Sequence, residues 1–131
     1  PADATATHLV SGEPHCPTAS WELVHEAVHI AKQKGERFRV GPVVSSDLFY
    51  NPDEGQYERW SKRGILAVEM EAAALFTLAA LRSVQGGCLL TVSDIVVYGE
   101  FVRISDEELR AAVDRMTRIA LDTATAGHDG H

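Results

Sequence analysis

The 131-residue chain has the length of one domain and is too short for two independent ones. Its apolar fraction of 45% and charged fraction of 24% are those of a soluble globular protein. The net charge of -7, without any cluster of Lys and Arg, argues against nucleic acid or a membrane surface as partner, because nothing would neutralise the phosphates. A small-molecule ligand fits this charge better.

The lack of a targeting signal and the use of cysteine lead us to expect a cytoplasmic protein. Cys16 and Cys88 match no metal or redox spacing, which favours a reducing compartment. The longest apolar stretch, residues 72–81, is too short to span a bilayer. The sequence begins with Pro1 and not with Met, so we expect it to be part of a longer protein.

Periodicity and turn residues predict the first elements of the fold. Residues 1–17 are expected to be mainly loop. From residue 20 to 34 apolar side chains recur every three or four positions, which predicts an amphipathic helix that ends at Gly35. Residues 38–44 are predicted to form a strand, and a loop with aromatic residues and turn chemistry at 51–55 follows it.

The middle of the chain is predicted to alternate between helix and strand. Residues 56–62 are expected to form a short polar helix that Gly64 closes. The apolar run 65–68 predicts a four-residue buried strand, and an apolar helix over 71–82 follows directly.

A further strand and helix are predicted in the last third. Residues 88–92 are apolar and predict a buried strand. Ser105 and Glu108 have the spacing of a capping box, so the last helix is expected to begin there and to run to about residue 123. Residues 126–131 are expected to be a frayed tail.

This order of elements predicts an α/β fold, with a mixed, mostly parallel sheet and flanking helices. Ligands of such sheets bind beyond the carboxyl ends of the strands. Three places are thereby selected for a site: the loop 46–53, the junction 68–71 and the junction 92–94.

The junction at Glu69-Met70-Glu71 carries two carboxylates before a wholly apolar helix. A carboxylate can accept hydrogen bonds from both vicinal hydroxyls of a ribose, and Met70 offers a soft apolar surface to the sugar. The alternative is that both glutamates only favour the positive end of the helix.

Two other segments could face a nucleobase. Asp94, after Ser93, could act as a general acid toward a ring nitrogen as a glycosidic bond breaks, although a cap or turn is the alternative for this pair. Phe49 and Tyr50 could stack on a planar base, and buried packing explains them equally well.

The segment His25-Glu26-Ala27-Val28-His29 matches the HExxH pattern of zinc hydrolases. A zinc site needs a third protein ligand, and the next histidine along the chain is His128 in the expected tail. We therefore favour a plain surface helix and expect no metal, and a zinc hydrolase is the remote alternative.

Three linked segments together resemble the purine and uridine nucleoside phosphorylase family, in particular the bacterial hexameric purine nucleoside phosphorylases. The resemblance runs from about residue 36 to residue 94 and, more weakly, through the last helix. It is carried by Arg39-Val40-Gly41 with Ser45-Ser46-Asp47-Leu48-Phe49-Tyr50 and Pro52-Asp53, by Gly64-Ile65-Leu66-Ala67-Val68-Glu69-Met70-Glu71-Ala72-Ala73, and by Thr91-Val92-Ser93-Asp94.

The resemblance implies a glycosyltransferase reaction. Phosphate would cleave the N-glycosidic bond of a purine nucleoside, giving the free base and ribose 1-phosphate, without a metal or organic cofactor and in a homo-oligomer. Asp94 would be the catalytic proton donor. The substrate-binding residues would be Phe49 and Val68 at the base, Met70 and Glu71 at the ribose, and Glu69 and Ser93 beside them.

The chain also departs from the family pattern. The arginine that assists the aspartate in purine-specific members has two candidates here, Arg103 and Arg110, and neither matches cleanly. Gln56 to Arg59 weakly resembles the base-reading segment of uridine phosphorylases, but Ser93-Asp94 favours purines.

The family's phosphate-binding segments have no counterpart in the chain. We therefore expect residues 1–131 to be the C-terminal part of a single phosphorylase domain, inactive alone. A nucleosidase of the same family, which uses water, and a non-catalytic nucleoside-binding module are the alternatives.

Overall fold

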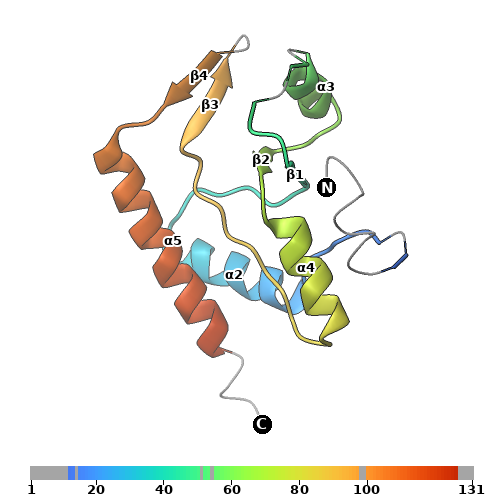
Figure 1. The fold of residues 1–131 in the computed structure, drawn as a ribbon. Helices are drawn as coiled ribbons and strands as arrows, with labels where there is room; N and C mark the ends of the chain where they lie inside the picture. Colours follow the sequence, from blue (N-terminus) through green and yellow to red (C-terminus); the bar gives the residue numbers. More distant parts are fainter. Residues whose placement is uncertain (1–11, 14, 51, 54, 98–99, 127–131) are drawn as a thin grey trace. The chain divides into compact units, whose positions relative to one another are not determined.

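The structure is a computed structural model that describes residues 12–13, 15–50, 52–53, 55–97 and 100–126 (Figure 1). The chain divides into two compact units. Unit 1 comprises residues 1–19 and 39–86, and unit 2 comprises residues 20–38 and 87–131.

Unit 1 contains a parallel strand pair that leads into a helix. Its described elements are β1 (Val43–Ser45), α3 (Gln56–Lys62), β2 (Ala67–Glu69) and α4 (Ala72–Leu81). β1 pairs with β2 in parallel, and Ser45 lies opposite Glu69. A strand was predicted over residues 38–44. The observed strand β1 is shorter and ends one residue later, because only three residues pair with β2.

The strand predicted over 65–68 is shifted and less buried than expected. β2 begins two residues later, and the Leu66 and Val68 side chains keep 42% and 38% of their surface exposed. The prediction of a buried strand was therefore wrong, because none of the three residues of β2 is buried. The short helix predicted over 56–62 is confirmed as α3.

Small residues bring α4 close to the strand pair. Ala72, Ala73, Thr77 and Ala79 are its buried residues, and the helix packs on β1. The Thr77 hydroxyl donates to the Ala73 carbonyl oxygen at 2.7 Å, which satisfies the one buried polar side chain of this helix.

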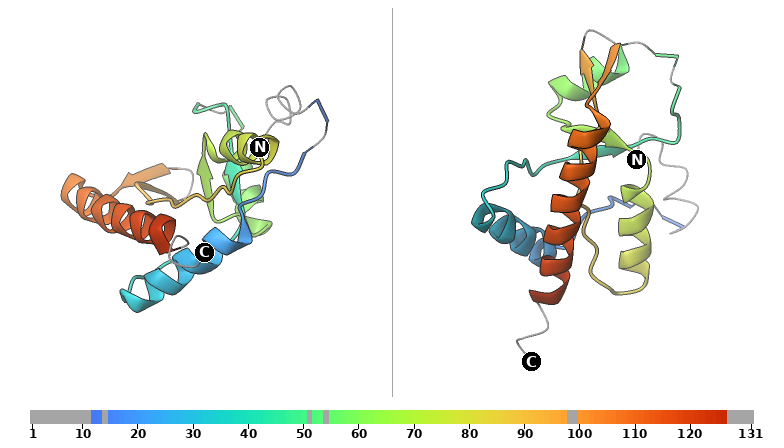
Figure 2. Two further views of the ribbon diagram at one scale, coloured as in Figure 1. Left: turned by 90° about the horizontal axis from the view of Figure 1, so that it is seen from below. Right: turned by 90° about the vertical axis from the view of Figure 1, so that its left-hand side faces the viewer.

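Unit 2 is built on two packed helices and a strand hairpin. Its described elements are α2 (Trp21–Gln33), β3 (Asp94–Val97), β4 (Glu100–Arg103) and α5 (Asp106–Ala126). Ile30 and Ala31 of α2 form a buried cluster with Ile119 of α5, and both views of Figure 2 show these helices side by side. The amphipathic helices predicted over 20–34 and from residue 105 are confirmed.

Two ion pairs border the helix pair of unit 2. Lys34 Nζ lies 2.8 Å from Asp122 Oδ2, and Arg115 Nε lies 3.3 Å from Glu36 Oε2. Because these side chains are half-buried to exposed, we expect the apolar cluster to contribute more to stability than the ion pairs.

Glycines end the two helices for which the sequence predicts a glycine stop. Gly35 follows α2 with φ of 70°, and Gly64 follows α3 with φ of 81°. Both lie in the left-handed region, where a side chain would be strained. The predicted glycine stops are therefore confirmed.

The strand predicted over 88–92 is absent, and a hairpin follows it instead. No strand of the described residues pairs with this segment, whose Leu90 and Val92 side chains are exposed. The first strand here begins at Asp94 and runs antiparallel to β4. The α/β class is confirmed, but the described strands form one parallel and one antiparallel pair where a single sheet was expected.

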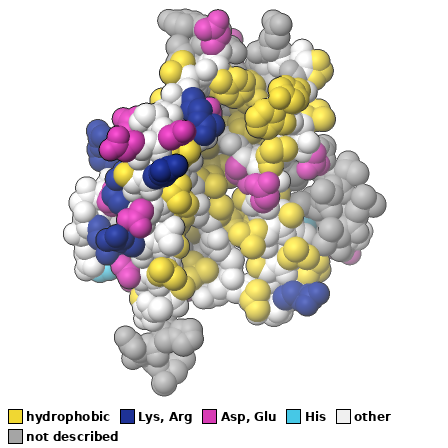
Figure 3. Space-filling model, turned by 60° about the vertical axis from the view of Figure 1, so that its left-hand side comes forward, with side chains coloured by type: hydrophobic (Ala, Val, Ile, Leu, Met, Phe, Trp, Pro, Cys, Tyr) yellow, Lys and Arg dark blue, Asp and Glu magenta, His cyan; other side chains and the backbone are white. Residues whose placement is uncertain are grey.

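The surface of the described residues mixes charges of both signs. In Figure 3, Lys and Arg side chains lie among Asp and Glu side chains on the face shown. Within the described ranges, no helix combines the length and the apolar character needed to cross a membrane.

The capping box at the start of α5 is confirmed. The Glu108 carboxylate accepts from the Ser105 amide at 3.1 Å and from its hydroxyl at 2.7 Å, and the Glu108 amide donates to Ser105 Oγ at 3.2 Å. The Ser105 hydroxyl, followed by its amide, lowers the pKa of Glu108. The carboxylate therefore stabilises the folded state at neutral pH, and this contribution is lost as the pH falls through the lowered pKa.

We expect Ser105→Ala to lower the Tm of the full-length protein at neutral pH by roughly 2 to 8 °C, because α5 loses its cap. Calorimetry at pH 7 and at a series of lower pH values tests this, and the difference from wild type should narrow as the pH falls through the lowered pKa of Glu108. Ser61→Ala, an exposed serine of α3, is the matched control. An equal loss in both variants would contradict the capping role.

Candidate functional site

The carboxylate of Glu69 is held by the chain itself. Oε1 accepts a hydrogen bond from the hydroxyl of Ser45, its register partner in β1. Oε2 accepts from the amide of Glu71 at 2.6 Å and from that of Ala72 at 2.5 Å. Glu69 therefore caps the N-terminus of α4, which is the alternative that the sequence left open for this residue.

Ser45 completes the same network. Its Oγ, while donating to Glu69, accepts a hydrogen bond from the Ala73 amide at 2.9 Å. Ser46 continues the strand ladder, because its amide donates to the Glu69 carbonyl at 2.9 Å. The end of β1, the end of β2 and the first amides of α4 are thus joined through two side chains.

Glu71 differs from Glu69 in both position and exposure. It is the N-cap residue of α4, with φ of -129°, and its carbonyl accepts from the Leu75 amide at 3.0 Å. Its side chain is exposed, as are those of Met70 and Val68. The backbone of Glu71 is therefore fixed, while its carboxylate faces solvent and can accept hydrogen bonds from a ligand.

The loop after β1 presents two aromatic rings. The rings of Phe49 and Tyr50 meet edge to face, with centroids 5.0 Å apart, and both side chains are exposed. At the start of the same loop, Ser46 is buried, and its hydroxyl accepts from the Leu48 amide at 3.2 Å. Ser46 thus anchors a loop whose aromatic faces stay accessible for stacking.

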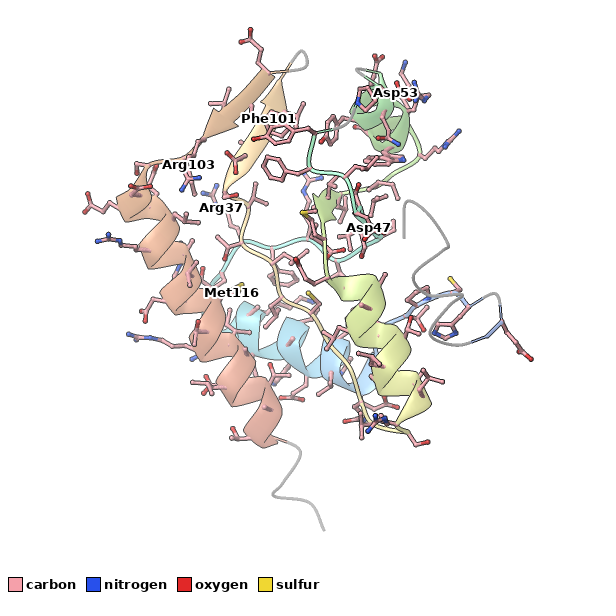
Figure 4. All side chains as sticks on the ribbon, viewed as in Figure 1. Arg37, Asp47, Asp53, Phe101, Arg103 and Met116 are labelled. Atoms are coloured by element: carbon pink, nitrogen blue, oxygen red, sulfur yellow. The ribbon has the colours of Figure 1, made fainter. Side chains whose placement is uncertain are left out.

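In the segment from Gln56 to Arg59, which weakly resembles the base-reading segment of uridine phosphorylases, Arg59 forms an ion pair with a nearby residue. Asp53 lies at the start of α3 (Figure 4), where it pairs with the Arg59 guanidinium and accepts from the Gly55 amide at 3.2 Å. The hydrogen bond from Arg59 holds the pKa of Asp53 below its ordinary value. This pair restrains Arg59 beside its own helix.

In unit 2, Ser93 and Asp94 form a hydrogen-bonded pair at the start of β3. The Ser93 hydroxyl donates to Asp94 Oδ2 at 2.5 Å, and both residues are half-buried. The Ser93 carbonyl accepts from the Ile104 amide at 3.0 Å, which extends the hairpin by one pair. Asp94 thus begins a strand, whereas the sequence placed it just after the end of one.

Of the two candidate arginines, Arg103 lies directly opposite Asp94. The two residues are register partners in the antiparallel pair, so their side chains leave the same face with Cβ atoms about 5 Å apart. The Arg103 guanidinium lies 3.6 Å from Asp106 Oδ1, beside the start of α5 (Figure 4). Arg110 is in the second turn of α5.

The HExxH histidines lie on α2 and contact their own helix. The His25 ring lies against the Trp21 ring, with centroids 5.6 Å apart, and His29 Nε2 is 2.9 Å from Nε2 of the Gln33 side chain. Both are exposed. Among the residues that the structure describes, no three His, Cys, Asp or Glu side chains gather as a metal site would require.

The structure brings the sugar-side residues together on unit 1 and the Ser-Asp pair with Arg103 on unit 2. That these two groups line one pocket stays a prediction. Sequence reasoning missed Ser45 as a structural partner of Glu69, since only the strand register places them opposite each other.

Residues 3–125 match the Phosphorylase superfamily, which is more than nine-tenths of the chain. The chain therefore belongs to this family.

Three similar proteins carry the same name. The purine nucleoside phosphorylase DeoD-type of Clostridium beijerinckii is 47% identical over 112 residues, covering 86% of this chain and 46% of the relative. Those of Exiguobacterium sp. and Geobacillus kaustophilus are 40% and 41% identical, and the matches cover 87% and 93% of this chain and 47% and 51% of the relatives. The chain thus spans about half the length of these relatives.

Proposed function

We propose that the full-length protein is a purine nucleoside phosphorylase, which uses phosphate to cleave the N-glycosidic bond and releases the base and ribose 1-phosphate. The observation that carries the proposal is the exposed Glu71 carboxylate on a fixed N-cap backbone, beside a Glu69 that already caps α4. The names of the relatives, at 40% to 47% identity, support the same activity.

On the sugar side, Glu71 would accept hydrogen bonds from the two ribose hydroxyls, and Met70 would pack against the ring. Phe49 would stack on the base, with Val68 as a second apolar contact. These contacts fix the anomeric carbon, so that the chemical step gains mainly from positioning.

On the base side, Asp94 would donate a proton to a purine ring nitrogen. As the glycosidic bond breaks, its electron pair moves to the base, and the anomeric carbon acquires oxocarbenium character. A phosphate oxygen then forms the new bond to that carbon. Arg103, opposite Asp94 in the hairpin, is the arginine we assign to assist the transfer by stabilising the carboxylate that Asp94 becomes.

The proposed reaction needs no metal or organic cofactor, and phosphate is its co-substrate. We also propose that the enzyme is a homo-oligomer in the cytoplasm. The exposed side chains of Cys16 and Cys88 suit a reducing compartment.

The test is release of hypoxanthine from inosine by the full-length protein, with and without inorganic phosphate. We expect release to require phosphate and ribose 1-phosphate to form in equal amount. Release of base with free ribose, independent of phosphate, would identify a nucleosidase instead. No release under either condition would refute both activities.

A further inference from the structure

Two side chains, and not one, fix the start of α4. The amides of Glu71, Ala72 and Ala73 are the first donors at this helix end, and each has a side-chain acceptor. Glu69 takes the first two, and Ser45 takes the third. Helix ends leave such amides unsatisfied unless side chains or water accept from them.

Ser45 also restrains Glu69 itself. A glutamate side chain has three rotatable bonds, so its carboxylate needs a second contact to stay at one place. The Ser45 hydroxyl supplies this contact by donating to Oε1, and the strand register keeps the two residues opposite each other. Ser45 is half-buried, which favours a hydroxyl over a larger polar group.

We propose that Ser45 is a positioning residue, which acts through Glu69 to hold Glu71 at the place where it binds the ribose. This inference rests on the proposed function. It assigns Glu69 to the support of the site and Glu71 to the sugar. Ser45→Ala would leave a Glu69 oxygen and the Ala73 amide without their partner, so the first turn of α4 and the Glu71 side chain would shift.

The experiment measures kcat and KM of the full-length protein for inosine and for phosphate. Ser45→Ala should raise KM for inosine by about tenfold or more, because the hydrogen bonds to a charged Glu71 are weakened. KM for phosphate should stay unchanged. A purely structural role would lower the active fraction and therefore kcat, without this selective change in KM.

Conservative variants complete the test. Ser45→Thr keeps the hydroxyl and should restore KM for inosine, whereas Ser45→Cys, whose thiol is a weak donor, should raise it even if Ser45→Ala fails to fold. Ser61→Ala is the control for a serine outside the network. A wild-type KM in Ser45→Cys, or a Ser45→Thr variant with raised KM, would overturn the proposal.

Failure of the proposed function has a different signature. In that case the wild-type protein itself releases no base with phosphate. If the wild-type protein is active and Glu71→Gln impairs it while the Ser45 variants match wild type, then the positioning role alone is refuted.

Discussion

Replacement of Glu71 by Gln in the full-length protein is expected to lower kcat/KM for inosine by about 100- to 10,000-fold. The carboxylate accepts from two ribose hydroxyls in the proposed complex, and hydrogen bonds to a charged group contribute about 1.5 to 3 kcal/mol each. Gln keeps the shape of the side chain but removes the charge and replaces one acceptor by a donor. Steady-state kinetics at saturating phosphate measure the effect.

The matched control is Glu107→Gln, because Glu107, like Glu71, is an exposed glutamate close to the N-terminus of a helix. This variant should keep wild-type kinetics. Both variants should also keep the wild-type Tm within about 1 °C, since surface substitutions cost little stability. A Glu71→Gln enzyme with wild-type kcat/KM would remove Glu71 from the sugar site.

Asp94→Asn is expected to lower kcat for inosine by about 100- to 10,000-fold, the usual contribution of general acid catalysis, with little change in KM. The amide preserves the size of the side chain and can still hydrogen-bond to Ser93, but it cannot deliver a proton to the base. The variant should therefore bind the nucleoside and fail in the chemical step.

Asp114→Asn serves as the control for Asp94→Asn. Asp114 forms an exposed ion pair with Arg118 one turn further along α5, and such pairs contribute little. A second comparison uses a nucleoside whose leaving base is stable as an anion, because the N–H group of the free base has a low pKa. Such a base leaves without protonation, so Asp94→Asn should be nearly as active as wild type on this substrate. An equal loss on both substrates would argue against the acid role.

Helices were predictable from the sequence because each carries its own signal. α2 and α5 show apolar periodicity, Gly35 ends the first, and Ser105 caps the second. These patterns involve residues within one or two turns of each other. They therefore need no knowledge of the rest of the fold.

Strands were predicted less well because pairing depends on distant residues. The apolar run 88–92 looks like a strand, yet no described strand pairs with it. The hairpin of β3 and β4 was missed, although the β-branched run of residues 95–97 and the pair Phe101-Val102, with a glycine between them, are a usable hairpin signal.

The candidate site shows the same difference between local signals and long-range contacts. The sequence could select Glu69 and Glu71 as a pair, because both stand at a strand-to-helix junction. The different surroundings of the two carboxylates follow from contacts that span 24 and 28 residues, between Ser45 and Glu69 and between Ser45 and Ala73. Such contacts exist only once β1 and β2 are paired.

The way α4 begins also bears on where phosphate can bind. The amino end of a helix attracts anions, and free phosphate often binds there. In this protein, Glu69 acts as a resident anion at that end, and its negative charge would repel a second one. If the proposed function holds, we therefore expect phosphate to be held by positive side chains elsewhere in the full-length protein. Phosphate would then not compete for the amides at the start of α4, which fix the backbone of Glu71, the residue proposed to bind the ribose.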